Sequence, residues 1–209
     1  MSIRAGCHPL CNPVLLTVIV VALILVSSGT PYSAYFEGSK FIHFLLGPAT
    51  VALGHPLYKN RCVVIEAAIP IVVALIVGSF TATISVVLVG LAFGLPDEIL
   101  ISIAPKSATA GISMGVSHSL GGDVSLTAAT TILTGIIGAI AVTPLMNVLG
   151  IKDWRARGFA AGLSAHGIGT ARALQINPIA GTFSGVAMGL NALGTAIVVP
   201  TILLLIHFR

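Results

Sequence analysis

Long apolar runs that contain almost no charge constrain this chain more than any other feature of its sequence. The run 62–94 holds one charged side chain, Glu66. Over the whole chain 56% of the residues are hydrophobic and 8% are charged, and the mean hydropathy is +1.07. Ordinary soluble domains are about 25% charged. A water-soluble fold is therefore excluded, and residues 1–209 are predicted to form a single membrane domain.

At about 20 residues per crossing, the apolar runs predict an all-α, polytopic transmembrane helix bundle. The predicted segments are 13–26, 38–58, 62–94, 99–119, 124–149, 157–175 and 178–207. Asn12 and Pro13 fit a helix cap followed by Pro at the first helical position. The first segment is therefore predicted to be a short span, with a cleaved signal peptide as the alternative. The run 62–94 is long enough for one tilted helix or two short ones.

Three of these segments are interrupted near their middle. The interruptions are Gly47-Pro48, Pro105-Lys106-Ser107 and His166-Gly167-Ile168-Gly169-Thr170. Lipid cannot replace the backbone hydrogen bonds that a break removes, so breaks persist only where protein or trapped water satisfies them. We therefore expect discontinuous helices that point toward an internal cavity.

The order of plain and broken segments favours an internal duplication. Residues 13–94 and 124–207 each read as helix, broken helix, helix, with the broken segment 99–119 between them. Cytoplasmic loops collect Lys and Arg, and basic residues follow the first break but precede the third. The two units then run oppositely through the membrane, and 99–119 enters and leaves on one side. This predicts an inverted repeat, which is typical of transporters.

The basic residues that define this topology fall in a few short clusters. They are Lys59 and Arg61 in the first unit, and Lys152, Arg155 and Arg157 in the second. The same layout puts Arg4 and Arg209 in the cytoplasm and Asp97 with Glu98 outside. Because most of the ten Lys and Arg residues sit at the ends of apolar runs rather than on one patch, the formal charge of +4 indicates topology, and no nucleic acid partner is expected.

A half-helix that begins inside the membrane offers unpaired N–H groups and a positive dipole end to an organic anion. The breaks supply such starts, and each carries a small hydroxyl residue. These candidates for substrate binding are Thr50, Ser107, Thr109 and Thr170, with the backbone of Gly167 and Gly169 beside the last. Ordinary capping of a kinked helix is the alternative role for the hydroxyls.

Lys106 and Arg172 lie next to two of the breaks and are the candidate clamps for an anion. A basic side chain near the membrane centre costs about 2.5–3.5 kcal/mol on insertion scales, so it is usually kept for function. Arg holds a carboxylate through two parallel hydrogen bonds, whereas Lys acts as a point charge. The alternative is that these side chains extend to the membrane surface or pair with a buried acid.

His166 and Asn191 complete the predicted site. His166 is placed to titrate near neutral pH and couple transport to protons, with a structural hydrogen bond as the alternative. Asn191 faces either a neighbouring helix or the cavity. No phosphate loop, nucleophile elbow, paired catalytic carboxylates or metal site is recognisable, so neither an enzyme nor a cofactor is predicted.

Four glycines look like packing positions rather than binding positions. Gly185 and Gly189, four residues apart, are predicted to form a small-residue face for close helix packing. Gly135 and Gly138 are predicted to do the same.

The strings around these breaks resemble the LrgB/CidB family of bacterial membrane proteins. They are Leu46-Gly47-Pro48-Ala49-Thr50-Val51-Ala52-Leu53, Pro105-Lys106-Ser107-Ala108-Thr109, Ser119-Leu120-Gly121-Gly122, and Ala165-His166-Gly167-Ile168-Gly169-Thr170-Ala171-Arg172-Ala173-Leu174. The continuation Phe183-Ser184-Gly185-Val186-Ala187-Met188-Gly189-Leu190-Asn191 fits as well. The resemblance covers nearly the whole chain.

This resemblance implies two functions. Members are described as antiholin-like or holin-like proteins that modulate murein hydrolase activity and cell lysis, usually beside a small membrane protein of the LrgA/CidA type. Related proteins carry glycolate and glycerate in chloroplasts, and bacterial pairs have been linked to pyruvate uptake. We therefore expect a multi-pass protein of the bacterial inner membrane that carries small monocarboxylates, with the holin-like regulator as the alternative. The partners implied are a small organic anion, the lipid bilayer, an LrgA/CidA-like protein and a second copy of the chain.

Overall fold

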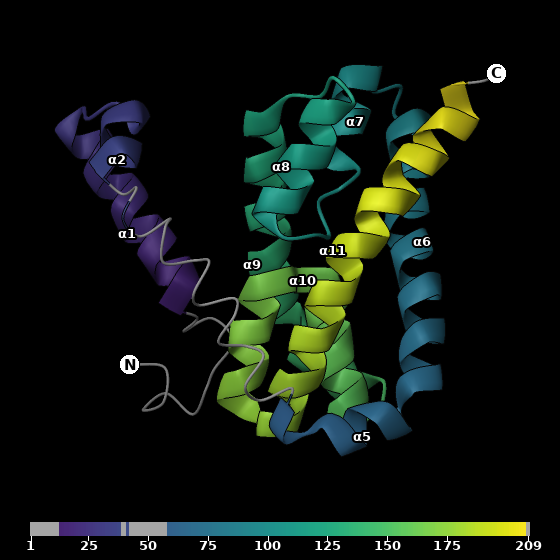
Figure 1. Cartoon of the computed structure of the whole chain (residues 1–209). Helices are drawn as coiled ribbons and strands as arrows, with labels where there is room; N and C mark the ends of the chain where they lie inside the picture. The colour runs from purple at the N-terminus through teal and green to yellow at the C-terminus, as the bar shows by residue number, and fades with distance from the viewer. Residues whose placement is uncertain (1–12, 39–40, 42–57, 208–209) are drawn as a thin grey trace.

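The computed structural model describes residues 13–38, 41 and 58–207 (Figure 1). Every regular element in this part of the chain is an α-helix, as the apolar runs predict. The elements are α1 (Pro13–Ser28), α2 (Tyr32–Gly38), α5 (Arg61–Glu66), α6 (Ala68–Ala92), α7 (Asp97–Ile103), α8 (Ala110–Ser119), α9 (Val124–Val148), α10 (Trp154–Ile176) and α11 (Pro178–His207). The predicted break at Gly47-Pro48, together with Thr50, lies outside the described residues.

Three described helices are long and apolar enough to cross a membrane. They are α6, α9 and the part Pro178–Leu205 of α11. At about 1.5 Å per residue each exceeds the hydrocarbon core of about 30 Å. The run 62–94 therefore crosses once, through α6, and α5 is a short helix before it. The predicted class, an all-α membrane bundle, is confirmed.

The segment 97–119 enters and leaves at one end of the bundle, as the charge pattern predicts. α7 and α8 both lie at the top of Figure 1, and α7 ends at Ile103 while α8 begins at Ala110. The Ser102 hydroxyl of α7 accepts a hydrogen bond at 2.7 Å from the backbone N–H of Asp123, which follows α8. We call α7, α8 and the break between them the first hairpin. Its tip is the predicted break at Pro105-Lys106-Ser107.

α10 is a second hairpin, and the prediction that 157–175 crosses the membrane is wrong. His166 has φ 40° and ψ −131°, which divides α10 into the halves 154–165 and 167–176. The halves fold back on one another. Gly169 in the second half lies so close to the first half that an added Cβ would collide with the Ala161 carbonyl oxygen and lie 2.7 Å from Ala165 Cβ. The second half therefore returns to the end of the bundle where the first half began, and α10 is the second hairpin from here on.

This return changes the direction of the last helix. α11 begins at the lower end of the bundle in Figure 1 and ends at the upper end, where α7 also lies. Arg209, expected in the cytoplasm, lies outside the described residues, but α11 runs toward the opposite end. α6 runs upward in Figure 1 and is followed by the first hairpin, whereas α9 runs downward and is followed by the second hairpin. These two helix–hairpin units are therefore oriented oppositely. The repeat units 13–94 and 124–207 include residues outside the described part and stay a prediction.

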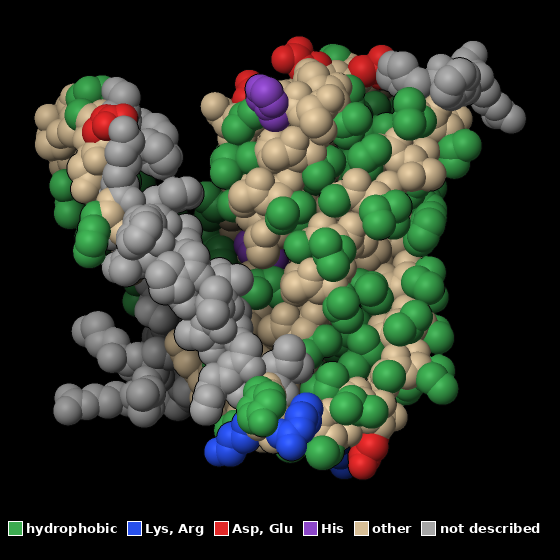
Figure 2. Space-filling model, viewed as in Figure 1, with side chains coloured by type: hydrophobic (Ala, Val, Ile, Leu, Met, Phe, Trp, Pro, Cys, Tyr) green, Lys and Arg blue, Asp and Glu red, His purple; other side chains and the backbone are tan. Residues whose placement is uncertain are grey.

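Charged side chains separate between the two ends of the bundle. Figure 2 shows Lys and Arg gathered at the lower end, where an acidic group also lies, and further Asp and Glu at the upper end, where no Lys or Arg is visible on this face. The upper helix α7 begins with Asp97 and Glu98, and Asp123 caps α9 by accepting from the Ser125 N–H at 2.7 Å. Because Lys and Arg collect in the cytoplasm, we take the lower end, here called the basic end, as cytoplasmic.

Candidate functional site

Asn191 joins the tips of both hairpins in the middle of the bundle. Its Nδ2 donates to the Ser107 carbonyl of the first hairpin at 3.0 Å and to the Leu163 carbonyl of the second hairpin at 3.1 Å. Its Oδ1 accepts from the Ser79 hydroxyl of α6 at 2.8 Å. Asn191 and Ser79 lie near the middle of the crossing helices α11 and α6. The tips therefore meet near mid-depth of the membrane.

His166 is the tip of the second hairpin. It is 5% exposed, and its Nε2 lies 2.9 Å from the Thr131 carbonyl oxygen of α9. Because a carbonyl oxygen only accepts, Nε2 is the donor in this hydrogen bond, and in the neutral ring Nδ1 is an acceptor. His166 is the only non-glycine residue with positive φ in the described part of the chain. Such a conformation costs about 1–3 kcal/mol and is maintained only by the packing around it.

Two glycines of α9 allow this tip to approach, as predicted for them. A Cβ added at Gly135 would lie 2.6 Å from His166 Cε1, and one added at Gly138 would lie 2.7 Å from Ala165 Cβ. Both distances are too short for a real Cβ. Close packing at Gly135 and Gly138 is therefore confirmed.

The close packing predicted for Gly185 and Gly189 is not found among the described residues. No described atom lies within 4 Å of a Cβ added at either position. The glycines that bring α10 against α11 are Gly158 and Gly162 instead, since a Cβ at either would collide with the backbone carbonyl of Ala180 or Ser184.

Thr170 fastens the returning half of the second hairpin to α11. Its hydroxyl donates to the His166 carbonyl at 2.9 Å and lies 2.9 Å from the Ser184 hydroxyl. Thr170 and Ser184 are both buried. Gly167, by contrast, is exposed, and the nearest atom to its added Cβ is Met188 Sδ at 3.8 Å. Thr170 is therefore engaged in packing, while the Gly167 backbone stays accessible.

Two half-helices begin at the joined tips. α8 begins after Thr109, whose side chain makes no capping hydrogen bond, and the second half of α10 begins after His166. The first N–H groups of a helix lack intrahelical partners and carry partial positive charge. Since both tips lie near mid-depth, both starts place that charge inside the membrane.

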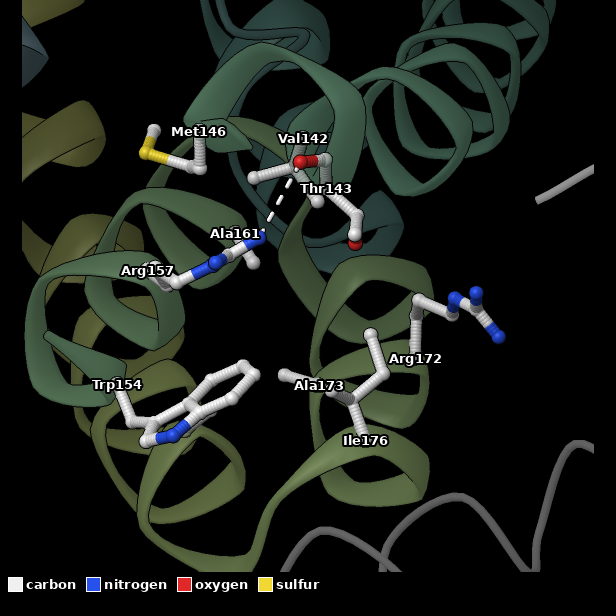
Figure 3. A pocket seen from close by; sticks show the side chains of 10 residues that line it. Val142, Thr143, Met146, Trp154, Arg157, Ala161, Arg172, Ala173 and Ile176 are labelled. Carbon is white, nitrogen blue, oxygen red and sulfur yellow. Dashed lines mark hydrogen bonds between the residues drawn. The ribbon is translucent and has the colours of Figure 1, made fainter. Parts of the chain in front are cut away.

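Arg172 is 4% exposed and lies in the returning half of the second hairpin. Together with Arg157 it lines a cavity of about 20 Å³, shown in Figure 3, which is room for about one water molecule. Arg157 points to Thr143 and donates to its carbonyl at 3.2 Å, whereas Arg172 points away from Trp154. The cavity is too small for an organic anion as the side chains stand.

Lys106 stands at the tip of the first hairpin and is half-buried. Its neighbours Pro105 and Ser107 are buried, and the Ser107 carbonyl is the group that Asn191 binds. No ion pair of Lys106 occurs in the part of the chain that the structure describes, where the one ion pair joins Arg155 to Asp153 at 2.8 Å. The ammonium is thus positioned near mid-depth without a described acid beside it.

The sequence comparisons agree with this architecture. The profile of the LrgB-like family matches residues 2–205. The chain belongs to the LrgB-like family. It is 34% identical to YxaC of Bacillus subtilis (strain 168) over 199 residues, which cover 95% of this chain and 86% of YxaC. It is 31% identical to the holin-like protein CidB of Staphylococcus aureus (strain N315) over 200 residues, which cover 96% of this chain and 87% of CidB. No solved structure matches the chain.

The predicted resemblance is thus confirmed, and this LrgB-like protein is a multi-pass protein of a bacterial membrane. Its candidate site brings together Ser107, His166, Thr170 and Asn191 at the hairpin tips, with Lys106, Thr109, Gly167 and Gly169 in the same two tips. Arg172 lies about 9 Å along the helix axis from His166. The binding roles of these residues, and of Thr50, stay predictions.

The sequence pattern did not identify several residues of this LrgB-like site. Ser79 and Ser184 hold the tips in place, and Arg157 lines the same small cavity as Arg172. The Thr131 carbonyl accepts the hydrogen bond from His166. The buried hydroxyl of Thr131 has no hydrogen-bond partner among the described residues. A serine or threonine hydroxyl inside an apolar helix can bond either to another helix or to the backbone of its own helix. The local sequence does not show which of the two it does.

Proposed function

We propose that this LrgB-like protein carries a small monocarboxylate, of the size of pyruvate, glycolate or glycerate, across the membrane. The observation that supports this best is the meeting of two half-helix starts near mid-depth, with Lys106 at one tip and the buried Arg172 behind the other. A carboxylate needs both positive charge and N–H donors once it leaves water. The hairpin tips supply both.

In this proposal the carboxylate binds the N–H groups after Thr109 and His166, and Lys106 and Arg172 neutralise its charge. Side chains of a helix lean toward its N-terminus, so the long Arg172 side chain can reach toward the start of its half-helix at the tip. Asn191 keeps the two tips in register rather than binding the anion itself, because both its amide donors are engaged. His166 is the group proposed to couple uptake to protons.

Uptake by purified protein in liposomes tests this assignment. Labelled pyruvate, glycolate or glycerate should accumulate with wild-type protein, and Lys106→Ala or Arg172→Ala should lower uptake about tenfold or more, because a hydrogen bond to a charged group contributes about 1.5–3 kcal/mol. Lys152→Ala removes the same charge from an exposed loop position and should leave uptake unchanged. Normal uptake by both site variants would refute the site.

The name of the relative CidB favours a second candidate, a holin-like regulator of murein hydrolase activity and lysis. Such a protein would act through a second copy of the chain or an LrgA/CidA-like partner rather than through substrate binding. Gly185 and Gly189 have open space in the described structure, so Gly185→Leu or Gly189→Leu would disturb contacts between chains and spare the monomer. This candidate predicts leakage of a trapped dye that these variants abolish and that Arg172→Ala does not change.

A further inference from the structure

A groove of about 450 Å³ opens on the flank of the bundle between α6 and the first half of α10. This volume lies within the range of about 300–1,000 Å³ that is typical of small-molecule sites. The aromatic rings of Phe159 and Phe183 line it, and both belong to a buried apolar cluster that also contains Ile71. The wall is therefore apolar and firmly packed.

The groove runs from the basic end of the bundle to mid-depth. Its charged lining residues are Glu66, Asp153 and Arg155, which lie at the ends of α5 and α10. At the other end Leu163 lines it, and the Leu163 carbonyl is bound by Asn191 at the hairpin tips. The part of α10 between Asp153 and Leu163 is about 15 Å long. This equals the hydrocarbon depth of one leaflet, about half of 30 Å.

The groove faces the lipid rather than the interior of the bundle. Ala74 and Pro70 line it and are exposed, and their neighbours on α6, Ile69 and Val73, are 79% and 55% exposed. Large apolar side chains exposed on a crossing helix contact lipid chains. A lipid can therefore enter sideways from the bilayer.

The described lining residues at the charged end of the groove sum to one net negative charge. Asp153 and Arg155 form an ion pair at 2.8 Å, and the hydrogen bonds from Arg155 hold the pKa of the Asp153 carboxyl below its usual value. Asp153 is therefore ionised at neutral pH. The Glu66 carboxylate is close enough to Arg155 to interact with it electrostatically. Two carboxylates and one guanidinium disfavour an anionic headgroup and favour one that presents an ammonium.

We infer that this groove holds an acyl chain of one phospholipid whose headgroup carries a primary ammonium, as in phosphatidylethanolamine. The ammonium donates hydrogen bonds to Glu66 and Asp153, and the adjacent phosphate accepts from Arg155. The acyl chain lies against Phe159 and Phe183. A choline headgroup has the same charge but no N–H donors, and a glycerol headgroup leaves the lipid anionic. This lipid site does not depend on the proposed anion site at the hairpin tips.

Native mass spectrometry of the full chain in detergent tests the inference, with phosphatidylethanolamine, phosphatidylcholine and phosphatidylglycerol of identical acyl chains added in turn. Wild-type protein should bind one phosphatidylethanolamine about fivefold more tightly than either other lipid, because only this headgroup makes charge-assisted hydrogen bonds to both carboxylates. Glu66→Gln should reduce this preference to about twofold or less.

A bulky residue in the groove supplies the second arm of the test. Ala74→Trp should fill the groove from its exposed side and abolish the tight site. Ala141→Trp is the matched control, because Ala141 is exposed on α9 in the same leaflet but does not line the groove, and it should bind lipid as wild type does. Equal binding of the three lipids, or wild-type binding by Ala74→Trp, would overturn the inference. A dimer that Ala74→Trp dissociates would instead assign the groove to a second copy of the chain.

Discussion

His166 combines a backbone conformation suited to glycine with a buried side chain that is hydrogen-bonded to α9. Its φ of 40° and ψ of −131° fall in a region that residues with a Cβ rarely adopt, yet its ring reaches the Thr131 carbonyl at 2.9 Å. A glycine such as the neighbouring Gly167 would adopt this conformation at no steric cost, but the chain has a histidine at the strained position. The contact that this histidine makes and a glycine could not is the hydrogen bond that anchors the tip to α9.

The strain predicts an unusual order of stability among substitutions at this position. His166→Gly and His166→Ala both lose the hydrogen bond to Thr131, but only glycine relieves the backbone strain of about 1–3 kcal/mol. His166→Gly should therefore unfold at a higher temperature than His166→Ala in the same detergent, followed by thermal unfolding. An equal or higher unfolding temperature for His166→Ala would contradict the backbone conformation at this tip.

At the scale of the element, the second hairpin depends on contacts between backbones that only glycine permits. Gly158 and Gly162 are four residues apart and therefore share one face of the first half of α10. On that face they meet the backbone of α11, and Gly169 brings the returning half against Ala161. In a membrane, where no hydrophobic effect drives helices together, such close approach supplies much of the packing energy.

Alanine at one of these glycines should separate the two helices. Gly162→Ala places a methyl group against the Ser184 backbone carbonyl and should cost about 1–3 kcal/mol of stability, as overpacking does. Gly185→Ala is the control on α11, since its added Cβ meets no described atom, and it should change stability by about 0.5 kcal/mol or less. Thermal unfolding in detergent measures both variants. Equal unfolding temperatures would show that the α10–α11 contact is looser than described.

At the scale of the whole molecule, two hairpins that enter from opposite ends and meet at mid-depth define the architecture. The basic end carries both ends of the second hairpin, and the acidic residues of α7 lie at the other end (Figures 1 and 2). α6, α9 and α11 cross completely and surround the tips. The arrangement gives a bilayer-spanning frame whose centre is lined by backbone ends and hydroxyl groups.

This topology predicts which positions are reached from each side. In a variant without native cysteines, single cysteines at Lys152 and Gln175 should both react with a membrane-impermeant maleimide in inverted vesicles. Cysteines at Glu98 and His118 should react in intact cells, because the first hairpin opens on the other side. Reaction of the Gln175→Cys variant in intact cells would show that 157–175 crosses the membrane after all.

The positions of the described breaks were predictable because they depend on local chemistry. Pro105 lacks an N–H and Gly167 and Gly169 weaken a helix, so the interruptions at Lys106 and His166 follow from the residues themselves. Whether a broken segment crosses or returns was not predictable, since 157–175 is long enough for either. The outcome depends on the contact of Gly169 with Ala161, which no local pattern specifies.

The glycine pairs show the same limit. Gly158 with Gly162 and Gly185 with Gly189 have identical spacing, yet only the first pair meets a backbone among the described residues. Which pair packs depends on how α10 and α11 are rotated against each other. Likewise, the sequence identified Asn191 as a polar residue in an apolar helix, but not that it joins Ser107 to Leu163.

Concentration-dependent uptake measured together with dye retention in the same liposomes tests the central proposal most directly. A carrier with a carboxylate site at the hairpin tips should give pyruvate, glycolate or glycerate uptake that saturates, while a trapped fluorescent dye of larger size stays inside. Uptake that rises without saturation and is accompanied by dye loss would contradict the carrier and favour a holin-like pore.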